Sequence, residues 1–188
     1  MNLIKKIQEF QRKSRWDGLK KRLNKGGGNG RIGKNLHVEN PQYIQIGDNF
    51  NAGDKLKLQA WHLNSNAPVP LISIGNNVSM IDDCQISCVN KIVLGDGCLL
   101  GDNVFITDNF HGSIALCEAN IPPQKRKIVS KGAITIGENV WIGRNVCIMP
   151  GVSIGNGAII GANAVVTHNV SENTIVAGAP AKTIKILS

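Results

Sequence analysis

The stretch Ile136–Ser171 reads IGENVWIGRNVCIMPGVSIGNGAIIGANAVVTHNVS and repeats itself every six residues. An aliphatic residue opens each of its six units, and a small or β-branched residue follows four positions later. In a coil of strands stacked about 4.8 Å apart, the same position of every unit lies above its counterpart, so these residues form continuous interior ladders. A short repeat of this kind is typical of a parallel β-helix. The sequence therefore predicts an all-β solenoid.

Weaker copies of the repeat extend the predicted coil over residues 31–186. Gly-x-Asn recurs at the unit boundaries, as in Gly33-Lys34-Asn35, and both Gly and Asn tolerate the positive φ of a tight corner. A Gly-rich sandwich would space its strands by about 8 to 12 residues, so the strict six-residue phase favours the coil. The phase disappears from Asp108 to Gly132, and we interpret residues 108–132 as a loop extruded from the coil.

The N-terminal arm, residues 1–30, differs in charge from the coil. The first 34 residues hold 11 Lys and Arg against two acidic residues, a net charge of +9, whereas the whole chain carries +8. Leu3, Ile7 and Phe10 recur at helical spacing, so we expect one or two short basic amphipathic helices. Two interpretations of the arm remain open: it caps the end of the coil, or it rests on an anionic membrane surface.

Composition and spacing disfavour several classes of protein. No apolar run reaches the ~18 residues of a membrane span, and the N-terminus lacks a signal-peptide pattern, so we expect a cytoplasmic protein. The five cysteines form no CxxC pair and the histidines lack ligand-like spacing, so we expect no disulfide framework and no metal. The basic arm lacks interleaved aromatic residues and any recognised nucleic-acid module, so we expect no nucleic-acid partner.

One histidine stands at the mouth of the predicted loop, in the segment Thr107-Asp108-Asn109-Phe110-His111. Loops on a rigid scaffold are where functional residues concentrate, and imidazole is the side chain best suited to accept a proton at neutral pH. A loop histidine taken alone is more often a plain surface residue than a base. The residue pattern leaves both interpretations open.

Two motifs connect the chain to a known family. Trp141-Ile142-Gly143 inside the repeat and Ala177-Gly178-Ala179-Pro180 after it resemble the signatures of the hexapeptide-repeat acyltransferases. The resemblance covers residues 72–186. Within the family, this segment is similar to the galactoside, maltose and nodulation O-acetyltransferases and to capsule and lipopolysaccharide O-acetyltransferases. It implies a left-handed parallel β-helix, a homotrimer with active sites between subunits, and acetyl-CoA as the acyl donor.

The resemblance also implies a mechanism. His111 matches the family's catalytic histidine, sixteen positions after Gly95, and as general base it would take the proton of an acceptor hydroxyl that attacks the thioester. The backbone amide of Gly143 or Arg144 would stabilise the oxyanion that forms. Direct transfer needs no acyl-enzyme, so no cysteine is expected to act as a nucleophile.

Further positions match contacts to the cofactor. Ala162 and Thr167 correspond to contacts along the pantetheine arm, and Lys182 and Lys185 correspond to basic residues that meet the phosphates. Trp141 corresponds to an active-site wall, although a surface aromatic is the plain alternative. We therefore expect residues 141–185 to hold the coenzyme.

The acceptor side is matched less closely. Asp82 and Asp83 fall in the region that lines the acceptor pocket of relatives, with a solvated corner as the equally open alternative. Asp108 is the candidate for orienting the catalytic histidine, and Asn109 is a candidate substrate contact. The chain departs from the family at His168, where relatives often carry Lys, and in a His-Gly motif that replaces His-Pro.

These features together predict an acetyl-CoA-dependent O-acetyltransferase. The His-Gly departure favours a polysaccharide or a lipid-linked saccharide over a small free sugar, and we expect surface-polysaccharide assembly as the setting. A sugar-amine N-acetyltransferase remains the alternative, since base, fold and cofactor are common to both.

Overall fold

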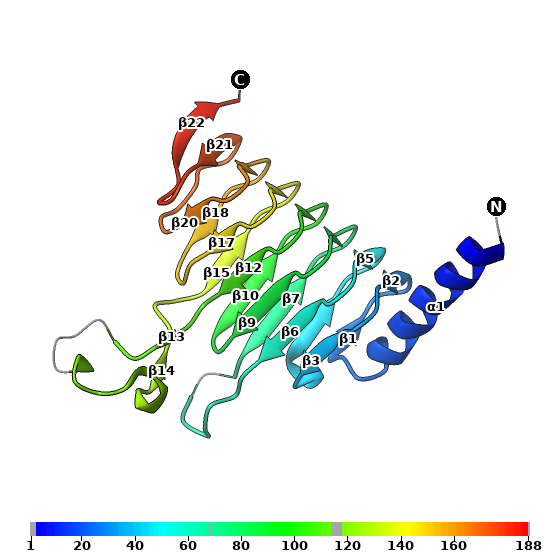
Figure 1. Ribbon diagram of the computed structural model, residues 1–188, viewed down its shortest axis with the longest axis horizontal. Coiled ribbons are helices and arrows are strands. Elements are labelled where there is room, and N and C mark those ends of the chain that lie inside the picture. The colour runs from blue at the N-terminus through cyan, green and yellow to red at the C-terminus, as the bar shows by residue number, and fades with distance from the viewer. Residues whose placement is uncertain (1–2, 68, 114–117, 188) are drawn as a thin grey trace.

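The structure is a computed structural model, and it describes residues 3–67, 69–113 and 118–187. Within these ranges it contains one α-helix, α1 (Leu3–Lys20), followed by short strands that build three sheets lying side by side (Figure 1). The strands of these sheets pair in parallel, except that the last strand of the second sheet is antiparallel to its neighbour. The chain visits the three sheets in rotation, so a strand pairs with the strands one turn before and one turn after it. Parallel sheets with one short helix agree with the predicted class of fold.

The strands of each sheet come from successive turns of the chain. The first sheet consists of β1 (Lys25–Gly26), β4 (Ile44–Ile46), β7 (Leu71–Ile74), β10 (Lys91–Leu94), β15 (Ile134–Ile136) and β18 (Ser153–Ile154). The second consists of β2 (Gly30–Ile32), β5 (Phe50–Ala52), β8 (Ser79–Met80), β11 (Leu99–Leu100), β16 (Trp141–Ile142), β19 (Ile159–Ile160), β21 (Thr174–Ala177) and β22 (Lys182–Ile186). The third consists of β3 (His37–Glu39), β6 (Lys57–Ala60), β9 (Gln85–Cys88), β12 (Phe105–Thr107), β17 (Cys147–Ile148) and β20 (Val165–Val166).

The interior holds the aliphatic ladders that the repeat predicts. Ile142 of β16 stacks between Leu100 of β11 and Ile160 of β19, and all three side chains are buried. Each such burial contributes about 1.5–3 kcal/mol, and the ladder adds one contribution per turn. The predicted ladders are confirmed, and the repeat therefore sets the register of the sheets.

Asparagine stabilises the corners between the second and third sheets. Asn103, Asn145 and Asn163 have φ between 55 and 60°, a left-handed conformation that Asn adopts more readily than most residues. Their side chains form a ladder of their own: Asn103 Nδ2 donates to Asn145 Oδ1 (3.0 Å), and Asn145 Nδ2 donates to Asn163 Oδ1 (2.9 Å). These corners hold the turns of the coil in line.

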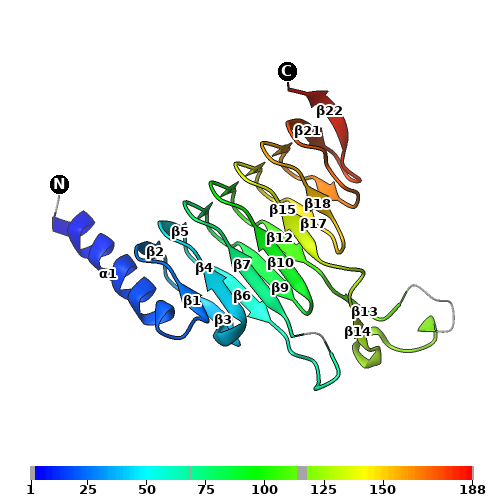
Figure 2. The ribbon, with the colours of Figure 1, turned by 180° about the vertical axis from the view of Figure 1, so that it is seen from behind.

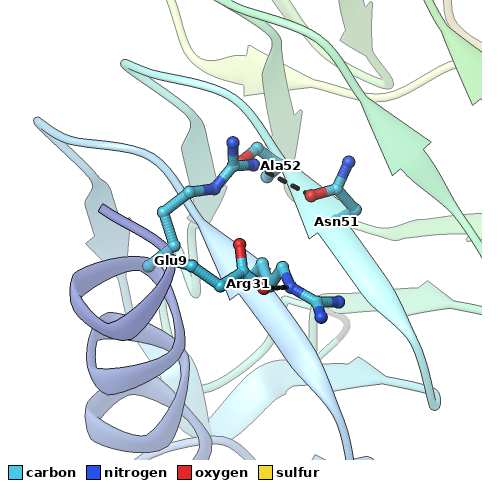
Figure 3. Close-up of polar contacts among 5 residues, drawn as sticks. Glu9, Arg31, Asn51 and Ala52 are labelled. Atoms are coloured by element: carbon cyan, nitrogen blue, oxygen red, sulfur yellow. Dashed lines mark hydrogen bonds and ion pairs between the residues drawn. The ribbon is translucent and has the colours of Figure 1, made fainter. Parts of the chain in front are cut away.

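Helix α1 covers the N-terminal end of the coil. Trp16 is fully buried against the first turns, with its ring 6.0 Å from that of Phe50. The Arg12 guanidinium donates to Asn51 Oδ1 (2.9 Å) and to the Ala52 carbonyl (2.8 Å), beside an ion pair of Glu9 and Arg31 (Figure 3). None of the described helices combines the length and the apolar character of a membrane span.

The chain leaves the three sheets between Thr107 and Ile134. There β13 (Phe110–His111) and β14 (Ile128–Val129) form a separate antiparallel pair, and a 3₁₀ turn covers Pro123–Lys125. In Figures 1 and 2 this segment projects away from the coil, next to the shorter connection between β6 and β7. Residues 114–117 of the segment, which include Cys117, lie outside the described residues.

Candidate active site

His111 lines a cavity of about 340 Å³ at one corner of the coil. The imidazole is exposed and stands on β13, which is held in place by its pairing with β14. Apolar groups supply most of the cavity wall, so a bound molecule would be partly shielded from water. The other lining residues are Trp61, Leu63, Ser87, Val89, Asn109 and Ile128.

Two segments far apart in sequence meet at this cavity. Residues 61–70 connect β6 to β7, and residues 108–133 connect β12 to β15, so both connections run from the third sheet to the first. The Trp61 backbone N–H donates to the Cys88 carbonyl (2.7 Å), which fixes the first segment to the turn that lies between them. The indole keeps 38% of its surface exposed, enough to present a face to a ligand.

Asp108, three residues before the histidine, is fully buried. Its Oδ1 accepts a hydrogen bond from the Val89 N–H (2.8 Å), and its Oδ2 accepts from the N–H groups of Asn90 and Lys91 (2.9 Å each). Within the described residues, no hydrogen bond joins this carboxylate to His111. The contacts show a carboxylate that holds the 89–91 turn, and the predicted role of orienting the histidine rests on no contact in the structure.

Asn109 lies in the cavity wall between these two residues. Its side-chain amide donates to the Ser87 carbonyl (3.1 Å) and to the Ser87 hydroxyl (3.2 Å). These bonds fix the strand end from which β13 departs. Of the acceptor-side candidates, the structure places Asn109 at the cavity of His111.

The buried cysteines Cys88, which contacts Asp108, and Cys84, which lies beside Asp83 at another corner, are poor nucleophiles. Burial raises the pKa of Cys88 far above its ordinary value, and the neighbouring Asp108 carboxylate adds to the rise. Burial likewise raises the pKa of Cys84 to about 11. A thiol with such a pKa holds almost no thiolate at neutral pH. These values agree with the expectation that neither thiol is acylated.

Asp82 and Asp83 lie at a different corner, between β8 and β9. Asp82 Oδ1 accepts a hydrogen bond from the Asp54 N–H (2.7 Å), and the Asp83 carboxylate lies 3.3 Å from Lys55 Nζ. Neither residue lines the cavity of His111 in this chain. Their predicted contact with the acceptor stays a prediction.

Most of the cofactor candidates gather on the second sheet and its following corner. Trp141 is 52% exposed, and a Cβ added at Gly143 would lie only 2.7 Å from the Ala162 nitrogen, so the two turns approach closely there. The exposed Lys182 and Lys185 stand on β22, beside β21.

Trp141 belongs to an outward-facing line across this sheet, in which exposed Leu99 precedes it. Trp141 pairs with Ile159, which pairs with Ile175, which lies opposite Lys185. Thr167 lies apart, at the corner after β20, with its hydroxyl 2.9 Å from His168 Nδ1. The structure thus brings together the candidates on the second sheet and leaves Thr167 outside the group.

The structure distinguishes the two oxyanion candidates. The Gly143 N–H donates to the Ile160 carbonyl (2.8 Å) and is therefore used by the coil. The Arg144 N–H has no acceptor among the residues that the structure describes. Arg144 is the backbone donor of the two that is left for a ligand.

Trp61 and Leu63 are cavity residues that the sequence did not reveal. They lie in a segment where the six-residue phase fails. The only available signal was that this segment, like the longer 108–132 interruption, comes directly before a strand of the first sheet.

For metal binding, none of the described residues form a group of three or more His, Cys, Asp or Glu side chains that could hold an ion.

Comparisons with known proteins test the resemblance drawn from the motifs. The model of the bacterial transferase hexapeptide family (six repeats) matches residues 133–168. The Escherichia coli (strain K12) protein WbbJ, which carries the name of a lipopolysaccharide biosynthesis O-acetyl transferase, is 39% identical over 153 residues, covering 79% of this chain and 74% of WbbJ. The chain belongs to the hexapeptide-repeat acyltransferases. The family resemblance predicted from the two motifs is confirmed.

Solved structures share the fold of this acyltransferase. The hexapeptide-repeat acetyltransferase VCA0836 of Vibrio cholerae, complexed with acetyl-CoA, has a TM-score of 0.66 at 21% identity, covering 93% of this chain and 77% of its own. A mutant of the N-acyltransferase AntD of Bacillus cereus, in complex with dTDP and CoA, has a TM-score of 0.75 at 22% identity, covering 92% and 88%. At these identities the likeness concerns the fold of the acyltransferase.

Proposed function

We propose that this acyltransferase moves an acetyl group from acetyl-CoA to a hydroxyl of a saccharide, with His111 as the general base. The observation that carries the proposal is the position of His111, an exposed imidazole in a cavity whose walls are mainly apolar and include an indole. The name of WbbJ supports O-acetyl transfer, and the complex of VCA0836 supports acetyl-CoA as donor. We place the reaction in the cytoplasm, where acetyl-CoA is available.

In this mechanism His111 takes the proton of the acceptor hydroxyl while the hydroxyl oxygen forms a bond to the thioester carbonyl carbon. The carbon–sulfur bond then breaks, and the proton passes from the imidazolium to the leaving thiolate. The Arg144 N–H is the proposed donor to the carbonyl oxygen while that oxygen is negative. General-base help of this kind contributes about 10²- to 10⁴-fold in rate.

We propose further that the coil is left-handed and that the active enzyme is a homotrimer. Within one chain, the cavity of His111 opens at the corner between the third and first sheets. By contrast, Arg144, Lys182 and Lys185 belong to the second sheet and the corner that follows it. These groups serve one reaction if the cavity of one subunit faces the second sheet of the next. The position of the two groups on different sides of the coil supports a site shared between subunits.

The proposed oxyanion donor is a backbone group, so proline tests it directly. Replacing Arg144 by Pro removes the N–H at a corner position where proline is commonly accommodated, and we expect kcat to fall by about 10²- to 10³-fold. Arg144→Ala keeps the N–H and should retain most of the activity. Asp102→Pro makes the same change one turn lower and controls for the fold. Equal kcat values for the Pro and Ala variants would exclude this donor.

Trp61 is the proposed platform for the acceptor. Its half-exposed indole in the wall of the His111 cavity presents a flat apolar face, to which the C–H face of a sugar ring can pack. We expect Trp61→Ala to raise the KM for the acceptor about tenfold while the KM for acetyl-CoA stays constant. Trp141→Ala should show the opposite pattern. Steady-state kinetics with each substrate varied in turn measures both, and a rise in the acetyl-CoA KM for Trp61→Ala would contradict the assignment.

The function itself is tested by measuring release of free CoA from acetyl-CoA across a panel of saccharides and amino sugars. Turnover with hydroxyl acceptors, and mass-spectrometric detection of an O-acetyl ester, is the expected result. The fold that the chain shares with AntD keeps N-acylation of an amino sugar as the second candidate. Turnover with amines alone would establish that alternative, and failure to bind acetyl-CoA would overturn both.

A further inference from the structure

Helix α1 carries two stripes of residues at the same spacing on opposite sides, and packing against the coil accounts for one of them. Positions 12, 16 and 19 face the coil, where Arg12 bonds to β5 and Trp16 and Leu19 are buried. Positions 3, 7 and 10 have the same spacing but precede them by nine residues, which at about 100° per residue is two and a half turns. The second stripe therefore lies on the side of the helix that faces away from the coil.

The second stripe is strongly exposed. Leu3, Ile7 and Phe10 keep 70%, 48% and 73% of their surfaces accessible. Capping the end of the coil requires only the buried side of α1, so it gives no reason for three large apolar residues in register on the opposite side. Lys6 and Lys13, also exposed, run along one flank of this stripe.

An apolar stripe flanked by lysines is the pattern of a helix that lies in the interface of a membrane. Lysine stems extend over the apolar surface while their ammonium groups reach the headgroups. The charge of the region complements such a surface, because the first 34 residues carry a net charge of +9 and the remaining 154 residues nearly cancel. Anionic headgroups attract each basic residue near the surface.

We propose that α1 docks the enzyme on an anionic lipid surface, with Leu3, Ile7 and Phe10 inserted at the boundary of headgroups and acyl chains. Docking by this side leaves the buried side of α1 and the coil as they are. The coil then rises away from the surface, since α1 covers its first turns.

The docked orientation bears on the acceptor. The cavity of His111 is lined by residues at the ends of the second, third and fourth strands of the third sheet. At about 4.8 Å per turn, it therefore spans from about 5 to about 15 Å along the coil from the first turn. A saccharide attached to a lipid in the same membrane spans such a distance with a few sugar units. This consequence, unlike the docking itself, rests on the proposed function, and it favours a lipid-linked acceptor.

Flotation of the full-length protein with vesicles tests the docking. We expect wild type to float with vesicles of equal parts phosphatidylcholine and phosphatidylglycerol and to stay unbound with phosphatidylcholine alone. The double variant Ile7→Ser/Phe10→Ser should bind the anionic vesicles at least about tenfold more weakly, because two large apolar side chains are lost from the bilayer. Gln11→Ser, an exposed change on the same helix, should bind like wild type. Circular dichroism checks that all variants keep their structure.

Acetyl transfer to a soluble saccharide, measured on the same proteins, separates this proposal from the proposed function. The double variant should transfer acetyl groups to the soluble acceptor at the wild-type rate. Wild type that fails to float, or a double variant that floats as well as wild type, would overturn the docking whatever the enzyme does. A wild-type assembly that the double variant breaks into smaller species on size exclusion would assign the stripe to a second copy instead. If the protein floats but acetylates no saccharide, the result supports the docking and contradicts the proposed function.

Discussion

Replacing His111 by Ala is expected to lower kcat for a saccharide hydroxyl by about 10²- to 10⁴-fold, the range that a general base contributes. The imidazole lines the cavity between the 61–70 and 108–133 connections. Among the residues that the structure describes, it takes part in no hydrogen bond. The substitution should therefore leave both the fold and the affinity for acetyl-CoA intact. Initial rates of CoA release, together with calorimetric binding of CoA, measure the two quantities separately.

His37→Ala provides a matched control for this experiment. His37 is also exposed, and its nearest charged partner is Glu39 at 3.2 Å, on the third sheet in the first turn of the coil. We expect its kcat to equal that of wild type. An amine acceptor is already a good nucleophile, so it should lose less rate in His111→Ala than a hydroxyl acceptor does. A variant that keeps the wild-type rate with hydroxyl acceptors would place the base elsewhere.

The regular part of the fold could be predicted because its determinants are local. Each turn of the coil places the same few positions in the interior. The spacing of Ile142 and Ile160 in the sequence therefore predicts that both are buried. The corners are equally local, since the left-handed conformation of Asn145 favours asparagine whatever surrounds it. Periodicity therefore predicted the ladders and the corners.

The site could be predicted only in part because its walls come from distant segments. Trp61 and His111 are brought together because two connections leave the coil at the same corner, about two turns apart, and the sequence between them shows no link. The use of Gly143 by the coil and the availability of Arg144 depend on hydrogen bonds to the next turn. The residue pattern alone left these two amides equivalent.

The N-terminal arm shows a third limit on what could be predicted from the sequence. Its helical spacing was visible, and its two interpretations, cap and membrane contact, were set against each other. The structure shows that Trp16 and Phe10 lie on different sides of the same helix, the first buried and the second exposed. The buried side of α1 suits the interpretation as a cap and the exposed side suits the interpretation as a membrane contact. The two interpretations therefore do not exclude each other.

Asp108→Ala is expected to lower the free energy of unfolding by about 2–5 kcal/mol, because it leaves three backbone N–H groups without their acceptor. Those groups belong to Val89, Asn90 and Lys91, which form the turn on which the cavity wall rests. Asp108→Asn keeps one oxygen but turns an NH₂ toward these donors, so we expect about half of the loss. Urea denaturation, followed by circular dichroism, measures both values.

The same two variants decide what Asp108 does for the reaction. A residue that holds the turn displaces Ser87, Val89 and His111 together when it is lost, so kcat should fall and the KM for the acceptor should rise in step with the loss of stability. A residue that orients the imidazole would instead lower kcat in Asp108→Asn with stability nearly unchanged. Asp102→Ala, at a half-buried corner where the carboxylate makes no hydrogen bond among the described residues, should change stability by less than about 0.5 kcal/mol and controls for the removal of a carboxylate. We expect the first pattern, because the carboxylate oxygens of Asp108 are both committed to the 89–91 turn.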